Sequence, residues 1–138
     1  MTSRILVGID GYKYSDKAFE YATSLAQKFE NSHLLIVNII EKPATIGQSL
    51  SVELERDRKG MLRKYQDKPS TRGLKSVNIV VEEGYSAAKQ ILEISSRENI
   101  DTIVIGSQGQ YLTLEDSIIG STSYKLAQSA KCTVVIAR

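Results

Sequence analysis

Residues 5–11 read Ile-Leu-Val-Gly-Ile-Asp-Gly, a short apolar run that stops at an acid and a glycine. The apolar residues do not alternate strictly with polar ones, which is typical of a strand that is covered on both faces. Four further runs of strand length and β-branched character lie at residues 34–40, 77–81, 102–105 and 133–136. We therefore predict five strands in a sheet with both faces covered.

Between these runs, apolar residues recur at every third or fourth position, which predicts helices. Ser15, Ser86 and Ser121 are the predicted N-caps of the first, third and last helix, and Asn99 is the predicted C-terminal stop of the third. Strands that alternate with helices indicate an α/β fold with an open parallel sheet. We see no linker and expect a single domain over residues 1–138.

Composition narrows the classes of function. The 138 residues are 41% apolar and 25% charged, and they include one cysteine, Cys132, which cannot form an internal disulfide. No apolar run is long enough for a membrane span or a signal peptide, so we expect a cytoplasmic protein with no membrane partner. The net charge of +2 is scattered along the chain, which argues against a nucleic-acid partner.

Glycine-rich and hydroxyl-rich loops follow two of the predicted strands. They are residues 10–15 after the first strand and residues 106–109 after the fourth, with Gly120 to Ser123 opening the last helix. Ligands of open parallel sheets bind beyond the carboxyl ends of the strands. Glycine backbone, a helix N-terminus and the hydroxyls of Ser107, Ser121, Thr122 and Ser123 together favour a phosphate group.

The common phosphate-binding motifs are absent, because there is no Gly-Lys-Ser/Thr and Gly8-Ile-Asp-Gly11 is not G-x-G-x-x-G. From spacing alone, the alternative that Gly106, Gly109 and Gly120 only shape loops and helix ends is about equally good. Basic residues 56–64 alternate with Glu55 and Asp57, and we interpret that stretch as a solvated helix face. No residue pair forms a convincing catalytic or metal site.

Five segments together resemble the universal stress protein family across almost the full length of the chain. They are residues 5–11, 81–84, 101–109, 120–121 and 132–136. The resemblance implies a Rossmann-like five-stranded parallel sheet in the order 3-2-1-4-5. It also implies the ATP-binding branch of the family, which is marked by G-x-x-G, nine residues, and then G-Ser/Thr.

The resemblance further implies a set of nucleotide-binding positions. Asp10 would lie against the adenosine, the main chain of Asn38 and Ile39 would read the adenine edge, and residues 106–109 and 120–122 would hold the ribose and phosphates. The full predicted set is Gly8, Ile9, Asp10, Gly11, Asn38, Ile39, Gly84, Gly106, Ser107, Gly109, Gly120, Ser121, Thr122 and Ser123.

Two departures from the family pattern bear on ATP. Ten residues, not nine, separate Gly109 from Gly120, and this segment carries Glu115 and Asp116 where the family often has a lysine. Two carboxylates near a triphosphate call for a bridging cation, so we expect ATP with Mg²⁺.

Two functions therefore stand side by side. The first is an ATP-binding stress-response module with at most slow hydrolysis, and the second is a universal stress protein that binds no nucleotide and works as a dimeric interaction module. In either case the last strand, Thr133 to Ala137, should be a sheet edge open to pairing. The resemblance implies a homodimer formed by antiparallel pairing of these strands. The stress, the pathway and the protein partners are not predicted.

Overall fold

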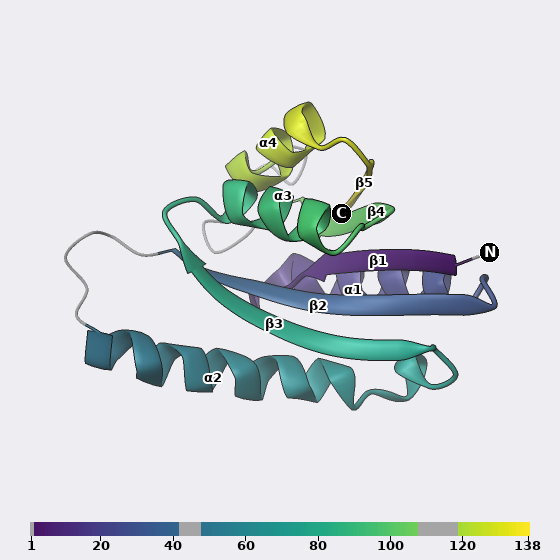
Figure 1. Cartoon of the computed structure of the whole chain (residues 1–138), viewed down its shortest axis with the longest axis horizontal. Coiled ribbons are helices and arrows are strands. Elements are labelled where there is room, and N and C mark those ends of the chain that lie inside the picture. Colours follow the sequence, from purple (N-terminus) through teal and green to yellow (C-terminus); the bar gives the residue numbers. More distant parts are fainter. Residues whose placement is uncertain (1, 42–47, 108–118) are drawn as a thin grey trace.

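The computed structural model describes residues 2–41, 48–107 and 119–138, and it contains one parallel sheet in these ranges. Its strands are β1 (Thr2–Gly8), β2 (Asn31–Glu41), β3 (Ser76–Gly84), β4 (Thr102–Gly106) and β5 (Thr133–Ala137). The order β3-β2-β1-β4-β5 confirms the predicted fold class (Figure 1). The strands β1 and β2 are longer than predicted because their first residues are polar and carry no apolar signal.

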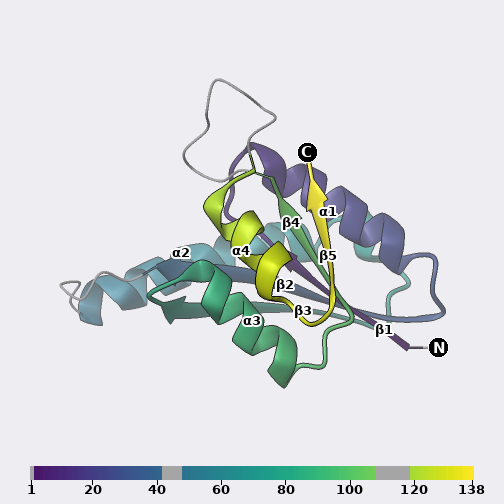
Figure 2. The same ribbon diagram turned by 90° about the horizontal axis from the view of Figure 1, so that it is seen from above.

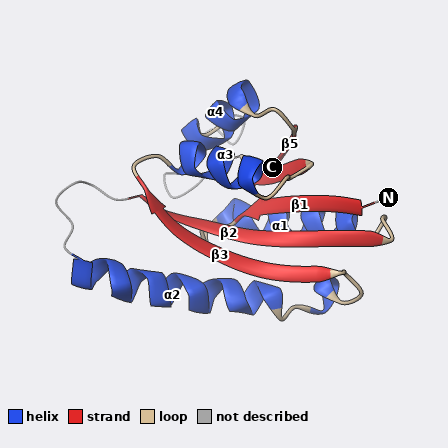
Figure 3. Ribbon diagram, in the orientation of Figure 1, coloured by secondary structure: helices blue, strands red, loops and turns tan. Residues whose placement is uncertain are grey.

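The helices cover both faces of the sheet (Figure 3). They are α1 (Lys13–Ala26), α2 (Gln48–Gln66), α3 (Ala87–Arg97) and α4 (Ser121–Ser129), with a short 3-10 helix η1 (Pro69–Thr71). The helices α1 and α2 pack on one face, and α3 and α4 pack on the other, where Figure 2 shows them in front of the sheet. Within the described part of the chain, none of the helices combines the length and the apolar character that a membrane crossing requires.

The central strand contributes to two separate cores. Ile5 and Val7 of β1 point into the core beneath α1 and α2, where Phe19 is buried, whereas Leu6 points into the core beneath α3 and α4 with Leu126. Successive side chains of a strand face opposite sides of the sheet. A strand without polar alternation is therefore what a doubly covered sheet requires, as the sequence predicted.

Two of the predicted helix ends are confirmed and two are wrong. Ser86 caps α3 by accepting a hydrogen bond from the Lys89 N–H at 3.3 Å, and Asn99, with φ of 53°, ends the same helix. Ser15 lies inside α1, whose N-cap is Tyr12, because its hydroxyl bonds to the preceding loop. Ser121 is the first residue of α4 and Gly120 is the cap, a role that glycine accepts.

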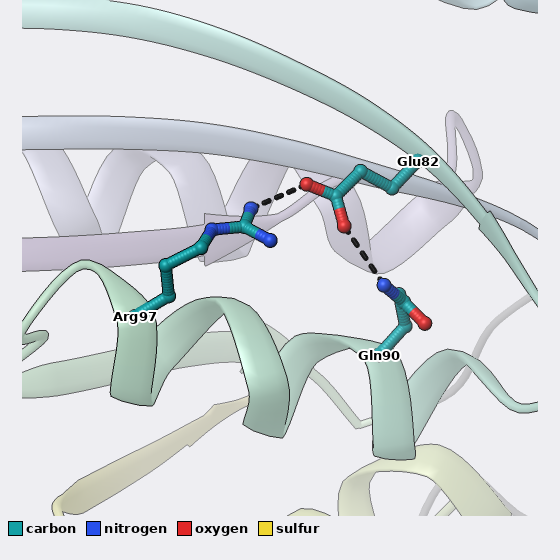
Figure 4. A network of polar contacts seen from close by, with 3 residues as sticks. All are labelled: Glu82, Gln90 and Arg97. Atoms are coloured by element: carbon teal, nitrogen blue, oxygen red, sulfur yellow. Dashed lines mark hydrogen bonds and ion pairs between the residues drawn. The ribbon is translucent and has the colours of Figure 1, made fainter.

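A polar network ties the edge strand β3 to α3. The Glu82 carboxylate accepts hydrogen bonds from Gln90, at 2.8 Å, and from Arg97 (Figure 4). Burial alone would raise the pKa of the Glu82 carboxyl, but the hydrogen bonds from Arg97 and Gln90 outweigh burial and lower that pKa. The ionised form of Glu82 therefore stabilises the fold.

Replacing Glu82 by glutamine should lower the free energy of unfolding near neutral pH. The pKa of Glu82 is lower in the folded chain, so its contribution is present above the unfolded value of about 4.3 and is lost as the pH falls through the folded pKa. Urea unfolding of wild type and Glu82→Gln from pH 7 to 3 should show the difference shrinking at the acid end. Glu20→Gln, at an exposed position of α1, is the control. A difference that persists unchanged at pH 3 would contradict this role.

Candidate functional site

A cavity of about 660 Å³ lies at the carboxyl ends of β1, β2 and β4. This volume is in the range of small-molecule sites, and the place is where the chain leaves β1 and β4 toward opposite faces of the sheet. The structure brings most of the predicted positions together in its wall: Gly8, Ile9, Asp10, Asn38, Ile39, Gly106, Gly120, Ser121, Thr122 and Ser123.

The remaining predicted positions are not in the wall. Gly11 makes the turn before α1 with φ of +87°, and Gly84 ends β3, where an added Cβ would lie 2.8 Å from the Gln90 Oε1. Ser107 is buried and does not line the cavity, and its N–H donates to the Ala137 carbonyl at 2.7 Å. Its Oγ has no hydrogen-bond partner in the part of the chain that the structure describes. Gly109 lies outside the described residues, as do Tyr111, Glu115 and Asp116.

The end of β2 offers backbone groups to the cavity. Its neighbour β1 stops at Gly8, while β2 continues to Glu41, paired with β3 alone. The last backbone hydrogen bond on this side of β2 is donated by the N–H of Ile9, the residue after β1, to the Val37 carbonyl at 2.8 Å. In a parallel strand, the backbone N–H and C=O groups of residues i and i+2 point toward the same neighbouring strand. The N–H and C=O of Ile39 therefore face the side where β1 has ended, where they could read the edge of a planar base.

The loop after β1 holds Asp10 in a fixed position. The Asp10 Oδ1 accepts hydrogen bonds from the Ser15 hydroxyl at 2.6 Å and from the Tyr12 N–H at 2.9 Å. The Ser15 Oγ in turn accepts from the Asp10 N–H at 2.9 Å and from the Gly11 N–H at 3.1 Å. These bonds use one carboxylate oxygen, so the second oxygen of Asp10 is the one that could accept a ligand hydroxyl.

Two of the predicted glycines lie close to atoms of neighbouring elements. A Cβ at Gly106 would lie 2.6 Å from the Tyr14 Cβ and 3.0 Å from the Tyr14 carbonyl oxygen, so α1 can lie against the end of β4 only with glycine there. A Cβ at Gly8 would lie 2.8 Å from the Ile105 Cδ1. For Gly106, the alternative that glycine shapes the fold is therefore supported by the structure, whereas at Gly8 the neighbouring atom is the end of a flexible side chain that can move aside.

The N-terminus of α4 presents N–H groups to the cavity that have no acceptor among the described residues. The Ser123 hydroxyl bonds to the Gly106 carbonyl at 2.5 Å, which joins the first turn of α4 to the end of β4. The Tyr124 N–H donates to the Gly120 carbonyl at 3.0 Å and makes the first bond within the helix. The N–H groups of residues 121–123 therefore lack helix partners, and they carry the positive end of the helix dipole. This end of the cavity is therefore the part whose chemistry best suits an anion.

The second helix N-terminus at the cavity is already occupied by a side chain. The Ala87 N–H, in the first turn of α3, donates to the Glu41 Oε1 at 3.1 Å. The charged described residues of the wall are thus the acids Asp10 and Glu41 and one base, Arg58. The described residues contain no cluster of three or more His, Cys, Asp or Glu that could hold a metal.

Arg58 is the functional candidate that sequence reasoning missed. The alternating charges of its stretch of α2 predict a solvated face, but Arg58 is half-buried in the cavity wall. The four-residue spacing from Leu54, which lines the same wall, is the signal that could have found it. The spacing is difficult to recognise because the residues on either side of Arg58, Asp57 and Lys59, are also charged.

Comparison with known proteins agrees with this fold. The family model described as the universal stress protein family matches residues 1–138. The chain is 26% identical over 152 aligned positions to the universal stress protein YxiE of Bacillus subtilis, with 100% of both chains covered.

Two solved structures are similar over nearly the whole chain. Universal stress protein UspA from Lactobacillus plantarum has a TM-score of 0.82 at 22% identity, covering 99% of this chain and 97% of that one. A universal stress protein in complex with cAMP has a TM-score of 0.76 at 21% identity, with the same coverage of 99% and 97%. The chain described here belongs to the universal stress protein family.

Proposed function

We propose that this protein binds ATP in the cavity at the ends of β1, β2 and β4, and that nucleotide occupancy makes it a regulatory module of the stress response. The observation that carries the proposal is the convergence of three different features on one cavity: the Asp10 loop, the free edge of β2 and the N-terminus of α4. A relative with the same fold was solved in complex with cAMP, which contains adenine, ribose and phosphate.

Each part of the nucleotide has a matching feature. The base fits against the main chain of Ile39, a ribose hydroxyl can donate to Asp10, and the phosphates fit the N–H groups of residues 121–123. Mg²⁺ usually binds through phosphates with one or two carboxylates. The described residues contain no metal cluster, which is compatible with a cation that enters bound to the nucleotide. Such a cation would offset the charge of Asp10 and Glu41.

Hydrolysis, if any, should be slow. Each of the two described acids of the wall has one oxygen engaged, Asp10 with the Ser15 hydroxyl and the Tyr12 N–H, and Glu41 with the Ala87 N–H. In the proposed binding mode the second oxygen of Asp10 accepts a ribose hydroxyl rather than the proton of an attacking water. A general base needs a free oxygen aligned with an attacking water, together with groups that stabilise the leaving phosphate. We therefore propose binding and switching rather than catalysis.

Replacing Gly120 by valine should reduce ATP affinity at least about tenfold, since a single charge-assisted hydrogen bond contributes about 1.5–3 kcal/mol. The reason is that the new side chain crowds the phosphate position at the N-terminus of α4. The Gly120 backbone, with φ of −67° and ψ of 164°, is open to any residue, so the variant should fold.

Titration calorimetry with ATP and Mg²⁺ measures this effect. The matched control is Gly60→Val on α2, where an added Cβ meets no atom within 4 Å. Unchanged ATP affinity in Gly120→Val would show that the phosphates do not approach α4, and the proposed binding mode would be wrong.

A second candidate function is a dimeric interaction module that binds no nucleotide. The observation in its favour is β5, which pairs with β4 on one side and forms an edge of the sheet. We propose that β5 pairs with its copy in a homodimer, whichever function holds. Sedimentation equilibrium of the purified protein tests the dimer, and a monomer at micromolar concentration would exclude it. Nucleotide retained by the purified protein would exclude the second function.

A further inference from the structure

Arg58 stands out because no described residue neutralises its charge. It is the only basic side chain among the described residues of the cavity wall, and it forms no ion pair with any described residue. The next residue, Lys59, pairs instead with Glu55, one helical turn earlier in α2, at 3.0 Å. A half-buried guanidinium beside a cavity is therefore available to a ligand.

The guanidinium is held at a defined place. The Arg58 Nη1 donates to the Asn38 Oδ1 at 3.3 Å, and the Asn38 Nδ2 donates to the Ile9 carbonyl at 2.7 Å. Asn38 is only 3% exposed, so this link is anchored in the sheet. A guanidinium carries several N–H donors in a rigid plane, and this contact uses one of them.

This anchor decides which part of a nucleotide Arg58 would meet. Asn38 lies on β2, next to Ile39, whereas the phosphate donors of α4 follow β4. The strand β1 lies between β2 and β4, and adjacent strands are about 4.8 Å apart, so the two places are roughly 10 Å apart. Arg58 is thus on the base side of the cavity, where Leu54 adds an apolar contact.

We infer that Arg58 packs its guanidinium against the base of the bound nucleotide and determines affinity for the adenosine part of the ligand. This inference rests on the proposed function and adds a residue to it. A planar cation is attracted to the face of an aromatic ring, most strongly where water is excluded. Because the contact is with the base, it contributes to the binding of neutral adenosine as well as to that of charged ATP.

The test compares adenosine and ATP binding in Arg58→Gln by calorimetry. Both affinities should fall, that for adenosine by roughly 5- to 30-fold, which is the size of a partly desolvated cation–π contact. Arg58→Lys keeps the charge without the plane and should lose less than Arg58→Gln. Arg56→Gln, which makes the same charge change at an exposed position of α2, is the control and should bind like wild type. Thermal unfolding of each variant checks that it is folded.

The other outcomes are separable. A loss for ATP alone would mean that Arg58 contacts phosphate, and unchanged binding of both ligands by Arg58→Gln would mean that it contacts nothing in the ligand. Either result overturns the inference and leaves the proposed function standing. If wild type binds neither ATP nor adenosine, the proposed function is wrong, and the role of Arg58 falls with it.

Discussion

Replacing Gly106 by alanine is expected to lower the free energy of unfolding by roughly 1–3 kcal/mol, the usual cost of forcing extra atoms into a packed interior. The added Cβ would lie 2.6 Å from the Tyr14 Cβ and 3.0 Å from the Tyr14 carbonyl oxygen. Backbone cannot move aside as a side-chain tip can, so the start of α1 must shift away from β4. That shift also displaces the Asp10 loop, and ATP affinity should fall in the same variant.

Urea unfolding of Gly106→Ala against Gly60→Ala measures this cost. Gly60 lies inside α2 with no atom within 4 Å of an added Cβ, so alanine there should raise stability by about 0.5–1 kcal/mol through helix propensity. The same chemical change is thus expected to act in opposite directions at the two sites. Gly106→Ala with wild-type stability would contradict the close packing of α1 on β4.

Truncating Leu126 to alanine is expected to cost roughly 2–5 kcal/mol of stability. Of the nine residues of helix α4, Ser123 and Leu126 are buried. Leu126 is 0% exposed in the core beneath α3 and α4, so it is the main apolar anchor of the helix. Because the same helix carries the proposed phosphate donors, ATP affinity should fall together with stability.

Leu126→Met is the matched control, since it keeps the volume and should cost less than about 1.5 kcal/mol. Thermal and urea unfolding give the stability of both variants, and calorimetry gives the ATP affinity. An alanine variant that loses little stability would show that α4 is held by contacts other than Leu126.

The packing of the sheet between two layers of helices was predictable because the strands are short and apolar on both sides. Ile5, Leu6 and Val7 are all completely buried, and each contacts one of the two cores. A surface strand would have shown polar alternation instead. The helices were predictable because apolar residues recur at every third or fourth position between the strands. The strand order, in contrast, was implied by the resemblance to the family.

The details of the site were less accessible because they depend on contacts distant in sequence. Ser15 has the composition of a helix cap, but its hydroxyl folds back to bond the Asp10 loop. In the sequence, Arg58 does not differ from the other charged residues of its helix. Only the fold brings it next to Asn38 of β2. Sequence spacing could not decide whether Gly106 serves a ligand or the fold, and the distance to Tyr14 shows that the fold requires it.

Binding of ATP to the purified wild-type protein, with and without Mg²⁺, tests the central claim most directly. Calorimetry should give saturable binding, and denaturing the freshly purified protein should release any nucleotide carried along. We predict one ATP-type ligand per chain, held more tightly with Mg²⁺ because the cation offsets the charge of Asp10 and Glu41. No binding under either condition, and no released nucleotide, would contradict the claim and leave the β5 edge as the functional surface.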